Sequence, residues 1–212
     1  MNDHLIYNSK SEYWKDVYKN KIRFLSKHNS TTIPWEIETV DPNVPKLLNR
    51  YNLNSGELLE IGCGKGIDAC YLSKKGFQVT AIDISEDAIA SAKQNGHGLD
   101  IEFSTQDFFV GIPRKKFDIV YDRGFLHNFK DKLPVIFEKV NFILNDQGKY
   151  IFITGNPNQP PIESCVPPPV FLSEIEAASS KWFKIISVEE MVFKVNENYL
   201  DSLGYIWYLE KR

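Results

Sequence analysis

Apolar runs and helix-like segments alternate regularly along residues 57–155 of this chain. The apolar runs lie at 57–62, 77–85, 101–108, 117–124 and 148–155, and segments with helical spacing lie at 67–75, 86–94 and 131–144. Strands separated by helices pair in parallel and need helices on both faces of their sheet. The pattern therefore predicts a doubly wound α/β fold. Ser85 is the expected N-cap of the helix that follows the second strand.

The last third of the chain departs from this alternation. A proline-rich segment at 156–169 precedes an expected helix near 172–180 and two β-like runs at 182–195 and 204–212. We expect these two runs to pair antiparallel at one edge. The result would be a seven-stranded, mostly parallel, Rossmann-like sheet with an antiparallel C-terminal edge strand.

Aromatic side chains mark the N-terminal segment. They are spaced like one face of a helix and are Tyr13, Trp14, Tyr18 and Phe24. Prolines interrupt the stretch that follows, and a short helix is expected at 46–51. The chain then divides, as a single domain, into an N-terminal helical lid at 1–45, a core at 46–155 and a substrate-side segment at 156–212.

Composition narrows the class of protein. With 212 residues, 42% of them hydrophobic and 25% charged, the chain suits one globular domain. A net charge of −3 gives no reason to expect nucleic acid or an anionic membrane as a partner. The three cysteines lack a C-x-x-C spacing, and neither a signal pattern nor a membrane-length apolar run is present. We therefore expect reduced thiols, a cytoplasmic location and no obligate protein partner.

The first predicted turn, LLEIGCGKG at 58–66, carries glycines at alternate positions after a buried strand. Glycines let backbone approach a ligand closely, and the following helix N-terminus favours anionic groups. A nucleoside-triphosphate loop needs another spacing, and a dinucleotide loop would place its third glycine where Ile67 stands. The acid Glu60, inside the strand, would also repel a pyrophosphate. The observed pattern is instead acid-x-G-x-G-x-G.

This pattern resembles motif I of the class I S-adenosylmethionine-dependent methyltransferases. The resemblance implies that loop amides meet the cofactor's carboxylate and that Glu60 orders the loop and the ammonium side. Asp83, at the end of the second strand, can accept both ribose hydroxyls. After the third strand, the family places a polar contact to the adenine amino group and an apolar contact to its ring. The residues expected on these grounds are Glu60, Gly62, Cys63, Gly64, Gly66, Asp83, Ile84, Gln106, Asp107 and Phe108.

Three further stretches resemble the thiopurine and thiol or halide branch of this family. They are SEYWKDVYKNK at 11–21, IPWEIETVDPNVP at 33–45 and YDRGFLHNF at 121–129. In that branch a tryptophan and a second aromatic four residues later cover the cofactor, and the matching positions are Trp14 and Tyr18.

The same resemblance assigns candidate roles around the fourth strand. Arg123 would lie beside the cofactor's methionine end or the substrate, and His127 is a candidate base or substrate ligand. Asp122 would contact the cofactor or orient Arg123. Trp14 and Trp35 would wall the pocket and exclude water, and the residues expected on the acceptor side are Tyr18, Trp35 and Phe125.

The resemblance implies methyl transfer from S-adenosylmethionine, which becomes S-adenosylhomocysteine, to a small molecule. We expect a soft nucleophile such as a thiol, thiopurine or halide, because such acceptors need positioning more than a strong base. Two alternatives stay open: an O- or N-methyltransferase of a small metabolite with His127 as general base, and a cofactor-binding module without turnover. No metal is expected, since the Mg²⁺-binding branch uses carboxylates after two strands and only Asp122 is available.

Overall fold

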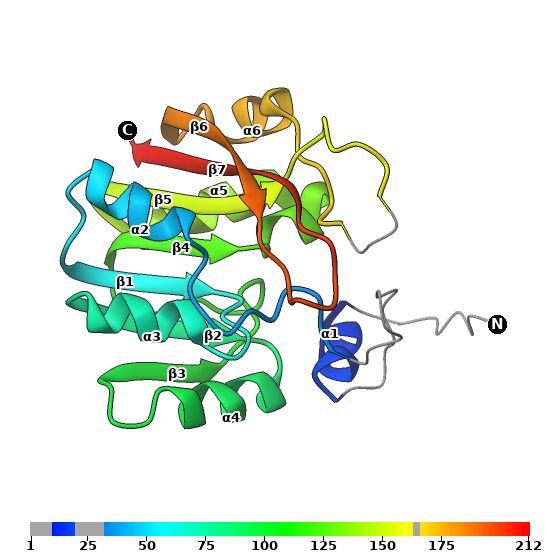
Figure 1. Cartoon of the computed structure of the whole chain (residues 1–212). Coiled ribbons are helices and arrows are strands. Elements are labelled where there is room, and N and C mark those ends of the chain that lie inside the picture. Colours follow the sequence, from blue (N-terminus) through cyan, green and yellow to red (C-terminus); the bar gives the residue numbers. More distant parts are fainter. Residues whose placement is uncertain (1–9, 20–31, 163–165) are drawn as a thin grey trace.

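The computed structural model of the chain, drawn in Figure 1, describes residues 10–19, 32–162 and 166–212. Phe24 of the expected lid and Cys165 lie outside these residues. The expected lid helix is α1 (Lys10–Tyr18), and it stands beside the end of the sheet toward which the arrows of the central strands point (Figure 1).

One sheet contains all the described strands. They are β1 (Gly56–Ile61), β2 (Phe77–Asp83), β3 (Ile101–Thr105), β4 (Phe117–Arg123), β5 (Leu144–Gly155), β6 (Phe183–Phe193) and β7 (Ser202–Lys211). Their order is β3-β2-β1-β4-β5-β7-β6. Neighbours from β3 to β5 are parallel, whereas β7 runs antiparallel to both β5 and β6. The expected antiparallel pair at one edge is confirmed, with β7 inside and β6 outermost.

Helices cover both faces of the sheet. Besides α1 they are α2 (Asn43–Arg50), α3 (Ile67–Lys74), α4 (Glu86–Asn95), the 3-10 helix η1 (Leu126–Lys132), α5 (Leu133–Ile143) and α6 (Leu172–Ser179). The helices α2, α3 and α4 pack on one face of the sheet, and η1, α5 and α6 pack on the other (Figure 1). The doubly wound fold is therefore confirmed. Ser85 is the N-cap of α4, since its hydroxyl accepts a hydrogen bond from the Ala88 N–H at 3.3 Å.

Two helix boundaries differ from expectation. α2 begins before residue 46 because the carboxylate of Asp41 accepts hydrogen bonds from the backbone and side-chain nitrogens of Asn43, at 3.0 and 2.8 Å. The expected border between lid and core thus falls inside a helix. The helix expected at 131–144 is preceded by η1, which is kinked at Phe129, and Pro134 stands in the first turn of α5. Proline suits that position because its missing N–H would have no partner there.

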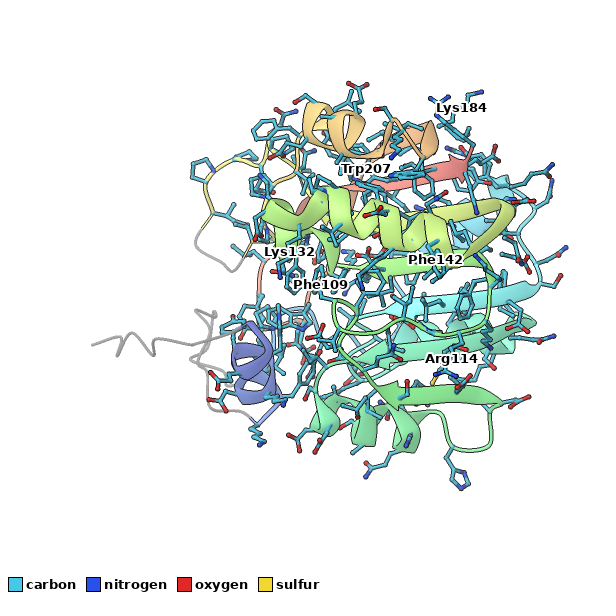
Figure 2. All side chains as sticks on the ribbon, turned by 180° about the vertical axis from the view of Figure 1, so that it is seen from behind. Phe109, Arg114, Lys132, Phe142, Lys184 and Trp207 are labelled. Carbon is cyan, nitrogen blue, oxygen red and sulfur yellow. The ribbon has the colours of Figure 1, made fainter. Side chains whose placement is uncertain are left out.

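Aromatic packing fixes the C-terminal strands on the sheet. Trp207 of β7 is fully buried, stacks on Phe152 of β5 with ring centroids 5.5 Å apart, and donates its indole N–H to the Thr154 hydroxyl at 2.9 Å. Figure 2 shows Trp207 beneath the helical layer. A close-packed sheet of this kind holds the loops at its strand ends in fixed positions. Within the described part of the chain, no helix combines the length and apolarity needed to cross a bilayer.

Candidate active site

The carboxyl ends of the central strands open into a cavity of about 900 Å³. Open α/β sheets bind ligands at this edge, where the strand order reverses around β1. Residues of α1, the 32–38 segment and the proline segment at 166–168 also line the cavity. The expected site residues that it brings together are Trp14, Tyr18, Trp35, Glu60, Gly62, Cys63, Gly64, Asp83, Ile84, Gln106, Asp107, Phe108, Arg123, Phe125 and His127.

The glycine loop makes a tight turn between β1 and α3. The N–H groups of Gly62 and Cys63 both donate to the carbonyl of Ile82, at 2.8 and 3.1 Å, which ties the loop to β2. Gly64 has a φ of +52°, and a β-carbon there would lie 2.6 Å from the hydroxyl oxygen of Tyr18. The missing side chain lets α1 close directly on the loop. Tyr18, expected on the acceptor side, therefore lies against the glycine loop.

The carboxylate of Asp83 joins the glycine loop to the start of α4. One oxygen accepts a hydrogen bond from the Gly64 N–H at 2.9 Å, and the other accepts from the Ser85 N–H at 2.9 Å. Burial raises the pKa of this carboxyl, and the hydrogen bonds from backbone N–H groups oppose that rise. Each carboxylate oxygen has further lone pairs. The group can therefore still accept hydrogen bonds from a ligand in the cavity.

Buried acids gather beside the loop. Glu60 is 3% exposed, and its Oε2 has no hydrogen-bond partner among the described residues. Burial raises the pKa of Glu60, and the charges of Asp68 and Asp83 raise it further. Asp68, in the first turn of α3, accepts a hydrogen bond from the Tyr121 hydroxyl at 2.8 Å, and burial raises its pKa as well. Such crowding is relieved by a positively charged ligand.

Arg123, at the end of β4, is engaged by the protein itself. Its guanidinium donates to the carbonyl of Trp35 at 3.0 Å and to the carbonyl of Lys194, and its Nε lies 3.6 Å from the fully buried carboxylate of Asp41. It also lies over the ring of Phe193, 4.8 Å from the centroid. These contacts join the lid segment to the chain after β6. Arg123 lines the cavity, and its expected catalytic role stays a prediction.

His127 is a buried, neutral imidazole at the cavity wall. It is 6% exposed, and its Nδ1 has no hydrogen-bond partner among the described residues. Burial, and in second place the positive charge of Arg123, lower the pKa of His127 from 6.5 to about 3. At pH 7 the ring can take part in hydrogen bonds but binds a proton weakly.

Aromatic rings pack within the lid segment, and one ion pair joins this segment to the glycine loop. Trp14 of α1 and Trp35 pack edge to face with ring centroids 5.4 Å apart. The ammonium of Lys65, inside the glycine loop, pairs with Glu36 at 2.5 Å. Both members of this ion pair line the cavity, and neither was expected from the sequence. In the sequence, these two residues are marked only by their positions: Glu36 follows Trp35, and Lys65 lies within the glycine loop.

The loop after β3 leads into an aromatic part of the cavity. The carboxylate of Asp107 accepts a hydrogen bond from the Phe109 N–H at 2.8 Å, which fixes the turn. The rings of Phe109, Phe125 and Phe129 lie with centroids 4.8 to 5.8 Å apart, and Lys132 stands over Phe109. We name these four residues the aromatic end. Of the four, the sequence singled out Phe125 alone.

Two residues expected to bind the cofactor, Gly66 and Asp122, are absent from the cavity lining, and their expected contact with the cofactor stays a prediction. A β-carbon at Gly66 would lie 2.9 Å from the Ala92 β-carbon, so this glycine lets the loop pack against α4. Asp122 is fully buried and accepts hydrogen bonds from two N–H groups at the start of η1 and from the Tyr150 hydroxyl, the last at 2.6 Å. Burial raises its pKa to about 7. Neighbours in a strand face opposite sides, so Asp122 points away from the side on which Arg123 lies.

The described residues contain no group of three or more His, Cys, Asp or Glu side chains arranged to hold a metal ion. The expectation of a metal-free site stays a prediction.

Comparison with known proteins gives one family. Residues 35–195, more than half of the chain, match the model of a methyltransferase domain. The chain is 27% identical over 123 residues to probable thiol methyltransferase 2 of Arabidopsis thaliana, covering 56% of this chain and 54% of that protein. It is 27% identical over 166 residues to thiocyanate methyltransferase 1 of the same plant, covering 74% and 71%. The chain thus spans about half the length of the first relative.

Solved structures share the fold. One, reported under "Conversion of a Disulfide Bond into a Thioacetal Group during Echinomycin Biosynthesis", superposes with a TM-score of 0.80 at 20% identity, covering 96% of this chain and 92% of that one. An S-adenosylmethionine-dependent methyltransferase from Anabaena variabilis gives 0.74 at 19% identity, covering 97% and 96%. TehB from Haemophilus influenzae gives 0.62 at 18% identity, covering 93% and 66%.

Proposed function

The chain belongs to the methyltransferase-domain family, which uses S-adenosylmethionine as methyl donor, and we propose that its acceptor is a small molecule with a soft nucleophile such as a thiol. When bound, the cofactor supplies a methyl group on a sulfonium; the acceptor's lone pair forms the new bond to carbon while the old carbon–sulfur bond breaks and leaves its electron pair on the donor sulfur. A thiol would give up its proton to solvent before the transfer.

The residues on the glycine-loop side fit this cofactor. The unpartnered Oε2 of Glu60 and the buried acids around it favour a ligand with positive charge, and S-adenosylmethionine carries an ammonium and a sulfonium. The spare lone pairs of Asp83 would accept the ribose hydroxyls. Gln106 and Asp107 would meet the polar edge of the adenine, and Ile84 with Phe108 would pack on its ring. The aromatic lid over the loop would exclude water.

The burial and the low pKa of His127 are the main reason to favour a thiol as the acceptor. His127 is the residue expected to act as base, yet burial and Arg123 hold its pKa at about 3. A base of that strength removes a proton from a phenol or an ammonium group poorly at neutral pH. A thiol, with an ordinary pKa of about 8.5, ionises by itself to a useful extent. The nearby positive charge of Arg123 favours an anionic sulfur at this wall.

The relatives give independent support. Two of the proteins to which the chain is similar bear names that refer to thiol and thiocyanate acceptors, both of them soft nucleophiles. Their identity of 27% supports an acceptor of this chemistry without specifying the compound.

We also propose that the protein works in the cytoplasm. Cys63 and Cys70 are free and buried, which suits a reducing compartment. Burial, followed by the charge of Asp83, raises the pKa of Cys63, so this thiol at the cavity wall stays protonated and unreactive.

The test compares three aromatic acceptors, namely benzenethiol, phenol and benzylamine, the last of which is an ammonium ion at neutral pH. Calorimetry first measures S-adenosylmethionine binding, and mass spectrometry then counts methylated product from each acceptor. We expect binding and a product from the thiol far in excess of the other two. Methylated phenol or benzylamine with an inert thiol would overturn the proposal, and tight binding without any product would favour a module without turnover.

A His127→Gln variant serves as the matched control. Glutamine keeps hydrogen-bonding atoms but cannot act as a base. We expect thiol methylation to change by about threefold or less, whereas loss of a true general base costs roughly 100-fold or more. A loss of that size would assign His127 to proton removal and return the acceptor to the oxygen or nitrogen class.

A further inference from the structure

Four buried carboxyl groups and one buried guanidinium form a cluster beside the glycine loop. The acids are Asp41, Glu60, Asp68 and Asp83, each at most 7% exposed, and we name them the acid cluster. The guanidinium of Arg123 lies 3.6 Å from the Asp41 carboxylate, and its charge acts on Glu60 and Asp68. One positive charge cannot compensate four negative charges, and an uncompensated buried charge is costly. The acid cluster therefore favours retention of a proton at neutral pH.

Hydrogen bonds favour the ionised form of three members of the acid cluster. Asp83 accepts hydrogen bonds from two backbone N–H groups, both at 2.9 Å. Asp41 accepts from both nitrogens of Asn43, at 3.0 and 2.8 Å. Asp68 accepts from the Tyr121 hydroxyl at 2.8 Å and from a backbone N–H. Because such donors stabilise a carboxylate more than a neutral carboxyl, these three acids hold a proton less readily than an acid without them.

Glu60 is the least supported member of the acid cluster. It accepts a hydrogen bond from the Ala69 N–H, but its Oε2 is buried without a hydrogen-bond partner among the described residues. Burial raises the pKa of Glu60 most, and the charges of Asp68 and Asp83 raise it further. The Ala69 N–H and the charge of Arg123 oppose this rise to a smaller extent. The proton of the acid cluster is therefore assigned to Glu60.

Three further titratable groups face Glu60 from neighbouring elements. They are Cys63 of the glycine loop, Cys70 of α3 and Tyr121 of β4. Burial raises the pKa of each of the three above its ordinary value, so all three stay protonated and neutral near pH 7. A proton that leaves this part of the cavity near neutral pH comes from a carboxyl group.

A positively charged ligand can replace this proton. Glu60, Asp68 and Asp83 all line the cavity, and a positive group beside them stabilises their carboxylates. S-adenosylmethionine carries an ammonium and a sulfonium. In S-adenosylhomocysteine the ammonium remains, but the sulfur is a neutral thioether. The two ligands therefore differ by one positive charge at nearly the same shape.

We infer that the cavity binds S-adenosylmethionine in exchange for the proton of Glu60, and that Glu60 thereby makes the site prefer this cofactor over its product. The proton leaves to solvent as the positive charge enters. Once the sulfonium charge is gone, the acid cluster again lacks compensation, Glu60 takes a proton back and the product is held less tightly. Glu60 is thus a residue that determines specificity between cofactor and product. The inference rests on the cofactor of the family and does not depend on the acceptor.

Calorimetry measures the proton exchange without turnover. S-adenosylmethionine and S-adenosylhomocysteine are each titrated into the protein at pH 6.5, where the α-amino groups of both ligands are already largely charged. The same titrations in two buffers of unlike ionisation enthalpy, PIPES and imidazole, give the number of protons released. We expect S-adenosylmethionine to release about half a proton or more in excess of S-adenosylhomocysteine. Equal proton release with the two ligands would overturn the inference.

Glu60→Gln keeps the shape of the side chain but cannot titrate. In this variant the excess proton release should vanish, and the preference for S-adenosylmethionine over S-adenosylhomocysteine should fall about threefold or more. Glu60→Asp keeps a carboxyl group and should retain the excess release. Glu176→Gln, at an exposed glutamate of α6, is the matched control and should equal wild type in both readouts. Undiminished proton release in Glu60→Gln would assign the proton to another group and overturn the role of Glu60.

The pH dependence of the two affinities checks the inference in the wild-type chain. The ratio of Kd for S-adenosylhomocysteine to Kd for S-adenosylmethionine should rise about threefold per pH unit between about pH 5.5 and 7, if half a proton separates the two ligands. A constant ratio would contradict the exchange. These measurements use no acceptor, so their failure leaves the thiol proposal intact, and an inert thiol leaves the exchange intact.

Discussion

Replacement of His127 by phenylalanine should change how the stability of the fold depends on pH. The pKa of His127 is about 3 in the folded chain against 6.5 for the free side chain. As pH falls below 6.5, the unfolded chain takes up a proton that the folded chain refuses, so the free energy of unfolding falls. The stability that His127 contributes is thus present above pH 6.5 and is lost as pH falls toward 3.

The size of this loss follows from the two pKa values. Each pH unit in the window costs about 1.4 kcal/mol, so the loss is about 2 kcal/mol at pH 5 and about 4.4 kcal/mol at pH 3. Asp122 acts in the opposite sense, because its folded-state pKa of about 7 lies above its ordinary value and the folded chain gains stability as pH falls from 7 toward 4. The two effects overlap in the wild-type curve, and the difference between wild type and variant isolates His127.

Urea unfolding at pH 7.5, 6 and 5 measures that difference. Between pH 7.5 and pH 5, His127→Phe should lose about 2 kcal/mol less free energy of unfolding than wild type. His97→Gln, at an exposed histidine, is the control and should run parallel to wild type. Parallel curves for His127→Phe as well would refute the buried neutral imidazole, and with it the argument that the site lacks a strong base.

Three further substitutions test the site and the packing that supports it. Asp83→Asn should weaken S-adenosylmethionine binding about tenfold or more in calorimetry, because it removes a charge that faces a cationic ligand. An unchanged affinity would mean that Asp83 only positions the glycine loop. Arg123→Ala should cost about 3–5 kcal/mol in urea unfolding, because the Asp41 carboxylate would stay buried without its positively charged partner. An unaltered midpoint would contradict the buried ion pair. Gly66→Ala should lower the melting temperature more than Gly98→Ala. Both glycines have a positive φ, +72° and +81°, but only Gly66 lies in a crowded position. Equal losses would refute the packing role of Gly66.

The order of strands and helices in the core was readable from the sequence because parallel strands are buried on both faces. Such strands appear as continuous apolar runs. The same rule does not predict that β7 lies inside the sheet and β6 at its edge. Both C-terminal runs are rich in β-forming residues, and their sequence order does not say which is outermost. The outer strand, β6, carries the neighbouring acids Glu189 and Glu190, whereas β7 carries Ile206 to Leu209 in its buried centre.

The part of the site that could be predicted from the sequence is the part formed by residues at the ends of strands. Glu60, the glycine loop and Asp83 stand at strand ends, and strand ends meet at one edge of a parallel sheet. Asp122 does not line the cavity, because strand alternation turns its side chain to the side of the sheet opposite Arg123. Phe109, Phe129 and Lys132 come together only through the fold of separate loops. Nothing in their local sequence distinguishes them from ordinary core or surface residues.

The claim that the protein methylates a thiolate without help from a base is tested most directly by kcat/KM against pH for a series of thiols of graded acidity. The account predicts that each profile rises until the thiol's own pKa and then levels, so the inflection moves with the acceptor. An inflection that stays at one pH for every acceptor would show that a group of the protein takes the proton, and would contradict the account.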